Sequence, residues 1–135
     1  MSAYIIAEAG VNHNGNLETA LKLCDSAKEV GADAIKFQTW ITEKVITKSV
    51  KQADYQTTNT GVSESQFDML KKLELSFNDF RKIKDYCDKI GIDFASTPDE
   101  PESLDFLLSL DVPFIKIGSG DMCNIPFLRY VGSKN

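Results

Sequence analysis

The chain has 135 residues, of which 42% are hydrophobic and 26% are charged, a composition typical of a soluble globular protein of about one domain. The formal net charge of −5 at pH 7 argues against a nucleic-acid or anionic-membrane surface, because such a surface needs a basic face. No apolar run approaches the roughly 18 residues of a membrane-spanning helix, and the N-terminal residues do not have the pattern of a signal peptide. These features predict a cytoplasmic protein.

The first half of the chain predicts a strand, a helix and a second strand. Residues 4–9 are apolar and strand-like, and Asn16 is a suitable N-cap for a helix that would end at Gly31. Residues 33–38 predict the second strand. The polar stretch 42–62 is long for a connection inside a compact domain, which indicates either a lid over a site or partial disorder.

The second half predicts four helices and two strands. A capping box at 63–66 opens a short helix to about residue 72, and a second helix lies between Ser76 and Gly91. A strand at 92–96 follows, and then a helix with Leu104, Leu107 and Leu108 on one face. The last two elements are a strand at 113–117 and a helix that begins near Pro126. Three of the predicted helices run directly into strands. Such strand-then-helix units form parallel sheets with right-handed crossovers, so the sequence predicts an α/β fold.

Two predicted strands contain a lysine, Lys36 and Lys116, in otherwise apolar surroundings. A buried ammonium group is costly unless it meets an anion or many acceptors. Each lysine could instead pair with a nearby carboxylate, or its strand could lie at an edge of the sheet. Two lysines in the same local pattern favour a ligand site for a doubly charged group such as phosphate.

Side-chain alternation along the strands places five polar residues on one face of the predicted sheet: Glu8, Lys36, Gln38, Thr97 and Lys116. All five lie toward the C-terminal ends of the strands. Barrels of the (β/α)₈ type and open α/β sheets place their sites at these ends. The sequence therefore predicts one shared site there.

Several of the candidate residues also have a structural interpretation. Ser119 lies between two glycines and could donate to phosphate or only cap a tight turn. Thr97 could donate to phosphate or form a turn before proline. Glu8 could act as a general base or accept from a sugar hydroxyl, or it could form an ion pair with Lys36 or Lys116. His13, the only histidine, could contact a substrate or cap its loop; no ligand cluster surrounds it, which makes zinc improbable.

The cysteines, Cys24, Cys87 and Cys123, are odd in number and far apart, and none forms a CxxC pair. This pattern is typical of reduced thiols in a cytoplasmic protein, and Cys24 and Cys87 fall on predicted apolar helix faces.

Four segments at the predicted strand ends carry a family resemblance: residues 6–15 (IAEAGVNHNG), 35–39 (IKFQT), 96–98 (STP) and 114–121 (FIKIGSGD). Together they resemble the N-acetylneuraminate synthase family, which includes the sialic, legionaminic and pseudaminic acid synthases. The resemblance extends over nearly the whole chain, with the motifs in the same order and spacing.

The resemblance implies a (β/α)₈ (TIM) barrel of which residues 1–135 hold about the first four β/α units. The second half of the barrel and a C-terminal antifreeze-like domain would be absent. The implied reaction condenses phosphoenolpyruvate with N-acetylmannosamine or a related N-acylated amino-hexose to a nine-carbon 2-keto sugar acid, with release of phosphate. A divalent metal (Mn or Mg), with its ligands outside this chain, and a homodimer are expected at full length.

The resemblance also assigns roles by position. The implied phosphoenolpyruvate-binding residues are Lys36, Thr97, Lys116 and Ser119, the implied sugar-binding residues are Gln38 and Asn59, and the implied catalytic residues are Glu8 and Asp121. Asp121 stands where most relatives carry Glu, and Asp99 stands where the family usually has Phe, which adds a negative charge near the phosphate. The isolated chain is expected to lack synthase activity. The alternatives are another phosphoenolpyruvate-dependent aldol-type synthase of the same barrel class, or a non-catalytic half-barrel that binds anions or acts as a scaffold.

Overall fold

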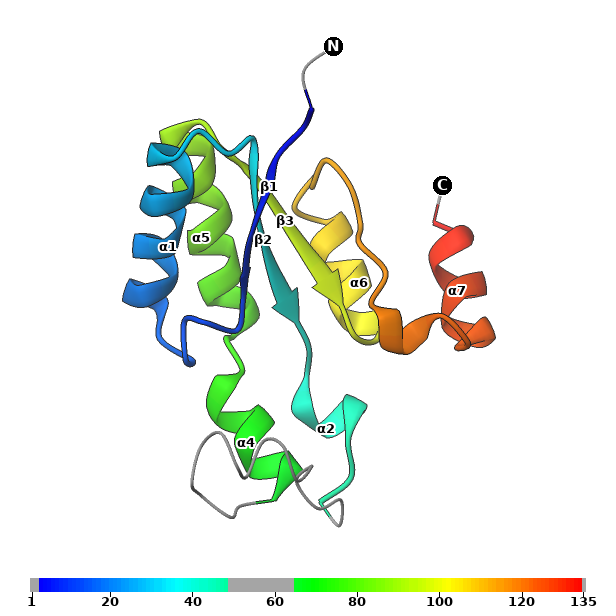
Figure 1. Ribbon diagram of the computed structural model, residues 1–135. Helices are drawn as coiled ribbons and strands as arrows, with labels where there is room; N and C mark the ends of the chain where they lie inside the picture. Colours follow the sequence, from blue (N-terminus) through cyan, green and yellow to red (C-terminus); the bar gives the residue numbers. More distant parts are fainter. Residues whose placement is uncertain (1–2, 49–64, 135) are drawn as a thin grey trace.

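A three-stranded parallel sheet forms the centre of the chain in the computed structural model, which describes residues 3–48 and 65–134. The strands are β1 (Ile6–Gly10), β2 (Ala34–Thr39) and β3 (Asp93–Pro98), in the order β1-β2-β3 (Figure 1). The predicted parallel α/β architecture is confirmed.

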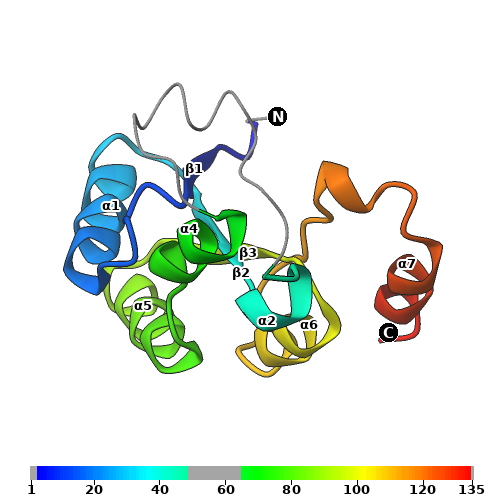
Figure 2. The same ribbon diagram turned by 90° about the horizontal axis from the view of Figure 1, so that it is seen from below.

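The helices flank the sheet and extend beyond its ends. They are α1 (Leu17–Glu29), α2 (Thr42–Val45), α4 (Gln66–Leu73), α5 (Phe77–Ile90), α6 (Pro101–Leu108), the 3₁₀ turn η1 (Ser119–Asp121) and α7 (Ile125–Gly132). Helices α1, α5 and α6 lie in a row along one side of the strands (Figure 2), and α2 and α4 lie beyond the C-terminal ends of the strands (Figure 1). None of these helices is long and apolar enough to cross a membrane.

Side-chain caps set the helix boundaries largely as predicted. The side chain of Asn16 accepts a hydrogen bond from the Thr19 N–H at 2.9 Å, and Gly91, with φ 71°, ends α5 in the left-handed conformation. The capping box predicted at residues 63–66 is corrected: the N-cap of α4 is Ser65, whose hydroxyl accepts from the Asp68 N–H at 3.0 Å. Residues 63 and 64 lie outside the described residues.

Aromatic side chains fill the space between the sheet and the helices. Phe37 on β2 contacts Phe94 on β3 and Phe80 on α5, with ring centroids 5.9 and 6.3 Å apart. All three are buried. Because strand side chains alternate, the residues next to Phe37, Lys36 and Gln38, face the opposite side of the sheet. One face of the sheet is therefore apolar and covered by helices, and the other carries polar groups.

The prediction of a fourth strand at residues 113–117 is wrong. Residues 113–117 contact β3 through one isolated parallel bridge, between Ile115 and Ser96. A strand needs continuous pairing with a neighbour, and one bridge does not supply it. The prediction that Lys116 is buried is also wrong, since its side chain is exposed. The alternative that its segment lies at an edge agrees with the structure.

The polar stretch predicted as a lid or a disordered segment begins with the short helix α2. Residues 49–62 of that stretch lie outside the described residues, so the lid stays a prediction.

The cysteines divide into a buried pair and an exposed thiol. Cys24 on α1 and Cys87 on α5 are buried with their Sγ atoms 3.6 Å apart, whereas Cys123 is exposed. The hydrogen bond to Cys24 and burial raise the pKa of the Cys87 thiol, which disfavours the reactive thiolate.

We expect dithiodipyridine to react rapidly with one thiol of the folded chain, the exposed Cys123, and with all three thiols after denaturation. Replacing Cys123 with serine should abolish the rapid phase; rapid reaction of three thiols would contradict the packing of α1 on α5.

Candidate functional site

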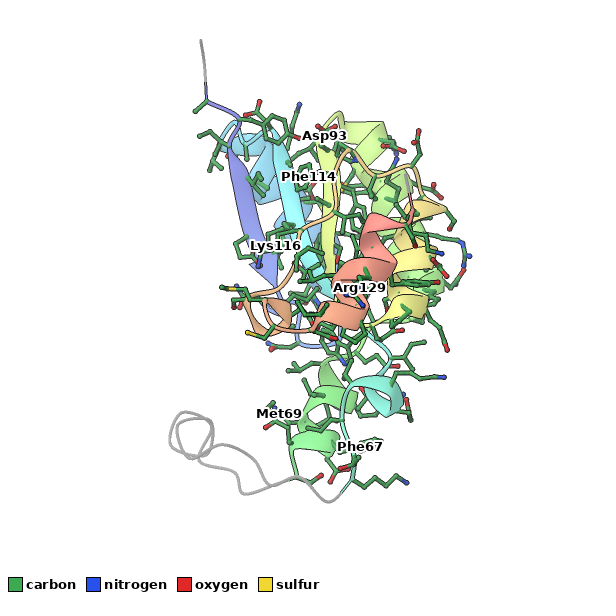
Figure 3. All side chains as sticks on the ribbon, turned by 90° about the vertical axis from the view of Figure 1, so that its right-hand side faces the viewer. Phe67, Met69, Asp93, Phe114, Lys116 and Arg129 are labelled. Atoms are coloured by element: carbon green, nitrogen blue, oxygen red, sulfur yellow. The ribbon has the colours of Figure 1, made fainter. Side chains whose placement is uncertain are left out.

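A cavity of about 470 Å³ opens at the C-terminal ends of the strands. Its lining residues are Glu8, Lys36, Gln38, Thr97, Asp99, Lys116, Gly118, Ser119 and Gly120. Six of the residues predicted to form a site therefore meet in one place. Lys116 reaches it from the segment between α6 and η1, which runs alongside the sheet (Figure 3).

The register of the sheet brings Glu8 and Lys36 together. Glu8 on β1 lies opposite Lys36 on β2, and their side chains form an ion pair. The Lys36 side chain is only 12% exposed, whereas that of Glu8 is 52% exposed. The ion pair between these residues, which the sequence left open, is thus present in this structure. The charge of Lys36 is therefore partly neutralised by Glu8 before any anion enters the cavity.

Gly10 leaves room for the acidic and amide groups beside this ion pair. It has φ 51°, and a Cβ at this position would lie 3.2 Å from Glu8 Oε1 and 3.7 Å from Gln38 Nε2. The sheet register also shifts between Glu8 and Gly10, so the strand bends just after Glu8. Glu8 and Gln38 consequently reach the same corner of the cavity.

Removing the charge of Glu8 should strengthen anion binding. Glu8→Gln frees Lys36 and removes a like charge from the cavity, so we expect the affinity for inorganic phosphate to rise about threefold, given the ~0.2–1 kcal/mol of a partly exposed pair. The measurement is a calorimetric titration at neutral pH. Glu29→Gln, at the exposed end of α1, is the matched control and should leave the affinity unchanged. A weaker affinity in Glu8→Gln would show that the carboxylate assists the anion.

Thr97 and Gln38 occupy paired positions on β3 and β2. Behind them, Ser96 and Thr39 share a buried hydroxyl–hydroxyl hydrogen bond of 2.7 Å. This bond and the backbone ladder hold the two strand ends in register. The polar groups of Thr97 and Gln38 therefore stand on a rigid part of the sheet, as binding residues require.

Two aspartates crowd around Gly118 at the rim of the cavity. A Cβ at Gly118 would lie 3.6 Å from Asp121 Oδ2 and 3.9 Å from Asp99 Oδ1. Burial, together with the nearby charges of Asp121 and Glu100, raises the pKa of Asp99 to about 6, while Lys116 acts in the opposite direction. Asp121 does not line the cavity that holds the other predicted residues, although its carboxylate lies close to it.

Asp121 instead lines a second cavity of about 520 Å³ beside the first. Asp99 lines both cavities, and the second also includes Lys44, Glu100, Asn124, Phe127 and Tyr130. The sequence did not predict this cavity.

The sequence analysis also did not identify Glu100 as the cap of α6. Glu100 is buried, and its carboxylate accepts from the Ser103 N–H at 2.9 Å. An acidic residue directly before Pro101 is a signal that could have indicated this cap.

His13 does not line either cavity. It is buried against Phe37 with ring centroids 6.0 Å apart, and its Nδ1 accepts from the Gly15 N–H at 3.0 Å. Burial lowers the pKa of His13. Of its two interpretations, the structure shows the loop-capping role. Asn59, the other predicted sugar-binding residue, lies outside the described residues.

The described residues do not supply a complete set of ligands for the metal that is expected in the full-length enzyme. Within residues 3–48 and 65–134, no group of three or more His, Cys, Asp or Glu side chains could hold a metal ion. The side chains in these two ranges therefore do not form a metal-binding site by themselves.

Two curated proteins are similar to this chain over nearly its whole length. The chain is 47% identical over 134 residues to the N,N'-diacetyllegionaminic acid synthase of Legionella pneumophila, covering 99% of this chain and 38% of that protein. It is 34% identical over 131 residues to the human N-acetylneuraminate-9-phosphate synthase, covering 97% of this chain and 36% of that protein. The chain therefore spans less than half the length of these curated relatives.

A solved structure shows the same fold. The N-acetylneuraminic acid synthetase of Leptospira borgpetersenii, solved in complex with citrate, is 32% identical with a TM-score of 0.80, covering 98% of this chain and 42% of that one. The NeuB family matches residues 23–135, which is most of the chain. On this match, and on the strand-end motifs that the structure brings together, the chain belongs to the NeuB family.

Proposed function

We propose that this chain is the N-terminal portion of a sialic-acid-type synthase. The full enzyme would condense phosphoenolpyruvate with N-acetylmannosamine or a related N-acylated amino-hexose to a nine-carbon 2-keto sugar acid, with release of phosphate. The observation that carries this proposal is the cavity at the strand ends. Its lining brings together two lysines, a hydroxyl group, a carboxylate and an amide, from Lys36, Lys116, Ser119, Glu8 and Gln38.

Each group has a chemical role suited to its position. Lys36 and Lys116 would neutralise the phosphate and carboxylate of phosphoenolpyruvate, and the hydroxyls of Thr97 and Ser119 would donate to their oxygens. In the proposed reaction, C3 of phosphoenolpyruvate attacks the aldehyde carbon of the open-chain sugar. Water then adds at C2, and phosphate leaves with cleavage of the C–O bond.

The remaining groups would orient the sugar and move protons. Gln38 and Asn59 would face the sugar, while Glu8 and Asp121 would act as acid or base near the reacting carbons. The half-exposed position of Glu8 beside the more deeply buried Lys36 supports this role. A divalent metal, Mn or Mg, would be held by residues outside this chain.

We also propose that the sheet is the start of a (β/α)₈ barrel. Support comes from the three parallel strands in sequential order, which would be the first three strands of such a barrel, and from the segment that bridges to β3, which would take the place of the fourth. A barrel needs roughly 250 residues, so further strands would have to cover the edge of β1, where Tyr4, Ile5 and Ile6 are exposed. The full-length enzyme would form a homodimer.

A chimera tests the proposed function. Residues 1–135 would replace the matching 38% of the Legionella pneumophila relative, which is similar enough for the barrel halves to pack. We expect phosphate release from phosphoenolpyruvate that depends on both a diacetamido-hexose and Mn²⁺. A folded chimera without this activity, beside an active parent enzyme, would contradict the proposal. The 135-residue chain alone should show no such activity.

A further inference from the structure

Asp99 lines two neighbouring cavities that differ in charge. The charged residues of the first cavity, besides Asp99, are Glu8, Lys36 and Lys116, and those of the second are Lys44, Glu100 and Asp121. The backbone of Asp99 is held in place, since its N–H donates to the Thr39 carbonyl at 3.1 Å. Its carboxyl group lies at the anion cavity, because Asp99 Oδ1 is 3.9 Å from the position of a Cβ on Gly118, which lines the same cavity.

We propose that Asp99 makes anion binding at the strand-end cavity depend on a proton: the cavity accepts a phosphate-bearing anion when Asp99 is a carboxylic acid and opposes it when Asp99 is a carboxylate. This inference rests on the proposed function, because it takes phosphoenolpyruvate as the anion. It concerns a position that the family resemblance does not assign to substrate.

Burial and the surrounding charges explain why the pKa of Asp99 is raised. Burial has the largest effect, and the like charges of Asp121 on η1 and Glu100 at the start of α6 add to it. Lys116 is the cation that favours the ionised form. Lys44 on α2 lines the second cavity and forms an ion pair of 2.8 Å with Glu102, so part of its charge is already matched.

An incoming anion should shift this balance toward the acid. A phosphate group brings negative charge to Lys116 and thereby removes the cation that favours ionised Asp99. Above the pKa of Asp99 in the free chain, which is about 6, the carboxyl is ionised and binding takes up a proton from solvent. By linkage, this proton makes affinity rise as the pH falls through that pKa, an effect measured as the difference from Asp99→Asn because the phosphate of the ligand titrates in the same range.

The carboxyl group of Asp99 can be observed directly. In a carbon-13 NMR titration of the 135-residue chain, the Asp99 carboxyl should titrate well above the ordinary range for aspartate, and higher still with phosphoenolpyruvate present. Titration of Asp99 in the ordinary aspartate range would overturn the inference.

Calorimetry measures the coupled proton. Phosphoenolpyruvate would be titrated into the chain at pH 7.5 and 5.5, in buffers of different ionisation enthalpy. Relative to Asp99→Asn, the unmodified chain should take up additional protons at pH 7.5, and its affinity at that pH should be about tenfold lower, the effect of ~1.4 kcal/mol. Asp111→Asn, at an exposed site before the 113–117 segment, is the matched control and should behave like the unmodified chain.

The outcomes separate the two proposals. Equal proton uptake and equal affinity in the unmodified chain and Asp99→Asn would overturn the role of Asp99 and leave the proposed anion site standing. Absence of binding by either folded protein at both pH values would instead overturn the proposed function, and this inference with it.

Discussion

Gly15→Ala is expected to destabilise the chain more than Gly31→Ala or Gly132→Ala. Gly15 has φ 69°, and a Cβ at this position would lie 2.1 Å from the backbone carbonyl oxygen of Lys72, in the last turn of α4. The left-handed conformation costs a non-glycine residue about 1–2 kcal/mol, and overpacking adds about 1–3 kcal/mol. We expect the free energy of unfolding in urea to fall by about 3 kcal/mol.

Two other glycines separate these contributions. Gly31 has φ 80° with nothing within 4 Å of an added Cβ, so Gly31→Ala should show the backbone cost alone. Gly132 in α7 has neither a positive φ nor a close neighbour, so Gly132→Ala should not destabilise the chain and should raise its stability slightly, because alanine favours a helix. If Gly15→Ala were no more destabilising than Gly31→Ala, then the loop after β1 would not pack against α4 as the structure shows.

Substituting either lysine of the cavity should severely impair the chimeric enzyme. A hydrogen bond to a charged group contributes about 1.5–3 kcal/mol, so Lys36→Ala and Lys116→Ala should each lower kcat/KM for phosphoenolpyruvate about ten- to a hundredfold. Steady-state phosphate release measures this effect. Lys36→Ala should also leave Glu8 without its partner, which adds a negative charge to the cavity.

The control for this prediction is Lys22→Ala, on the exposed surface of α1. It removes the same charge from the chain without touching the cavity and should leave kcat/KM unchanged. Activity of Lys36→Ala and Lys116→Ala within about twofold of the parent would exclude these lysines as phosphoenolpyruvate ligands.

Side-chain alternation predicted the polar face of the sheet correctly because it depends on the backbone alone. Lys36 and Gln38 face the cavity and Phe37 faces the helices, as a period of two residues requires. The bulge between Glu8 and Gly10 could not be predicted, since it depends on how β1 pairs with β2. Glu8 precedes the bulge, so its predicted orientation was unaffected.

Features that depend on distant parts of the chain escaped prediction. The apolar pattern of residues 113–117 resembles a strand, yet a strand needs a partner on a neighbouring segment, and β3 provides only one bridge. The exposure of Lys116 follows from this edge position. Likewise, the raised pKa of Asp99 depends on burial and on Asp121, which the turn around Gly118 brings near.

Titration of the 135-residue chain with phosphoenolpyruvate tests the central claim most directly. Isothermal calorimetry, without added metal, would compare the chain with a Lys36→Ala/Lys116→Ala double variant, and with a Lys22→Ala/Lys89→Ala variant that removes two exposed helix lysines. We predict that the chain and the helix variant bind and that the cavity variant does not. Equal binding by all three proteins, or no binding by the folded chain, would contradict an anion site at the ends of these strands.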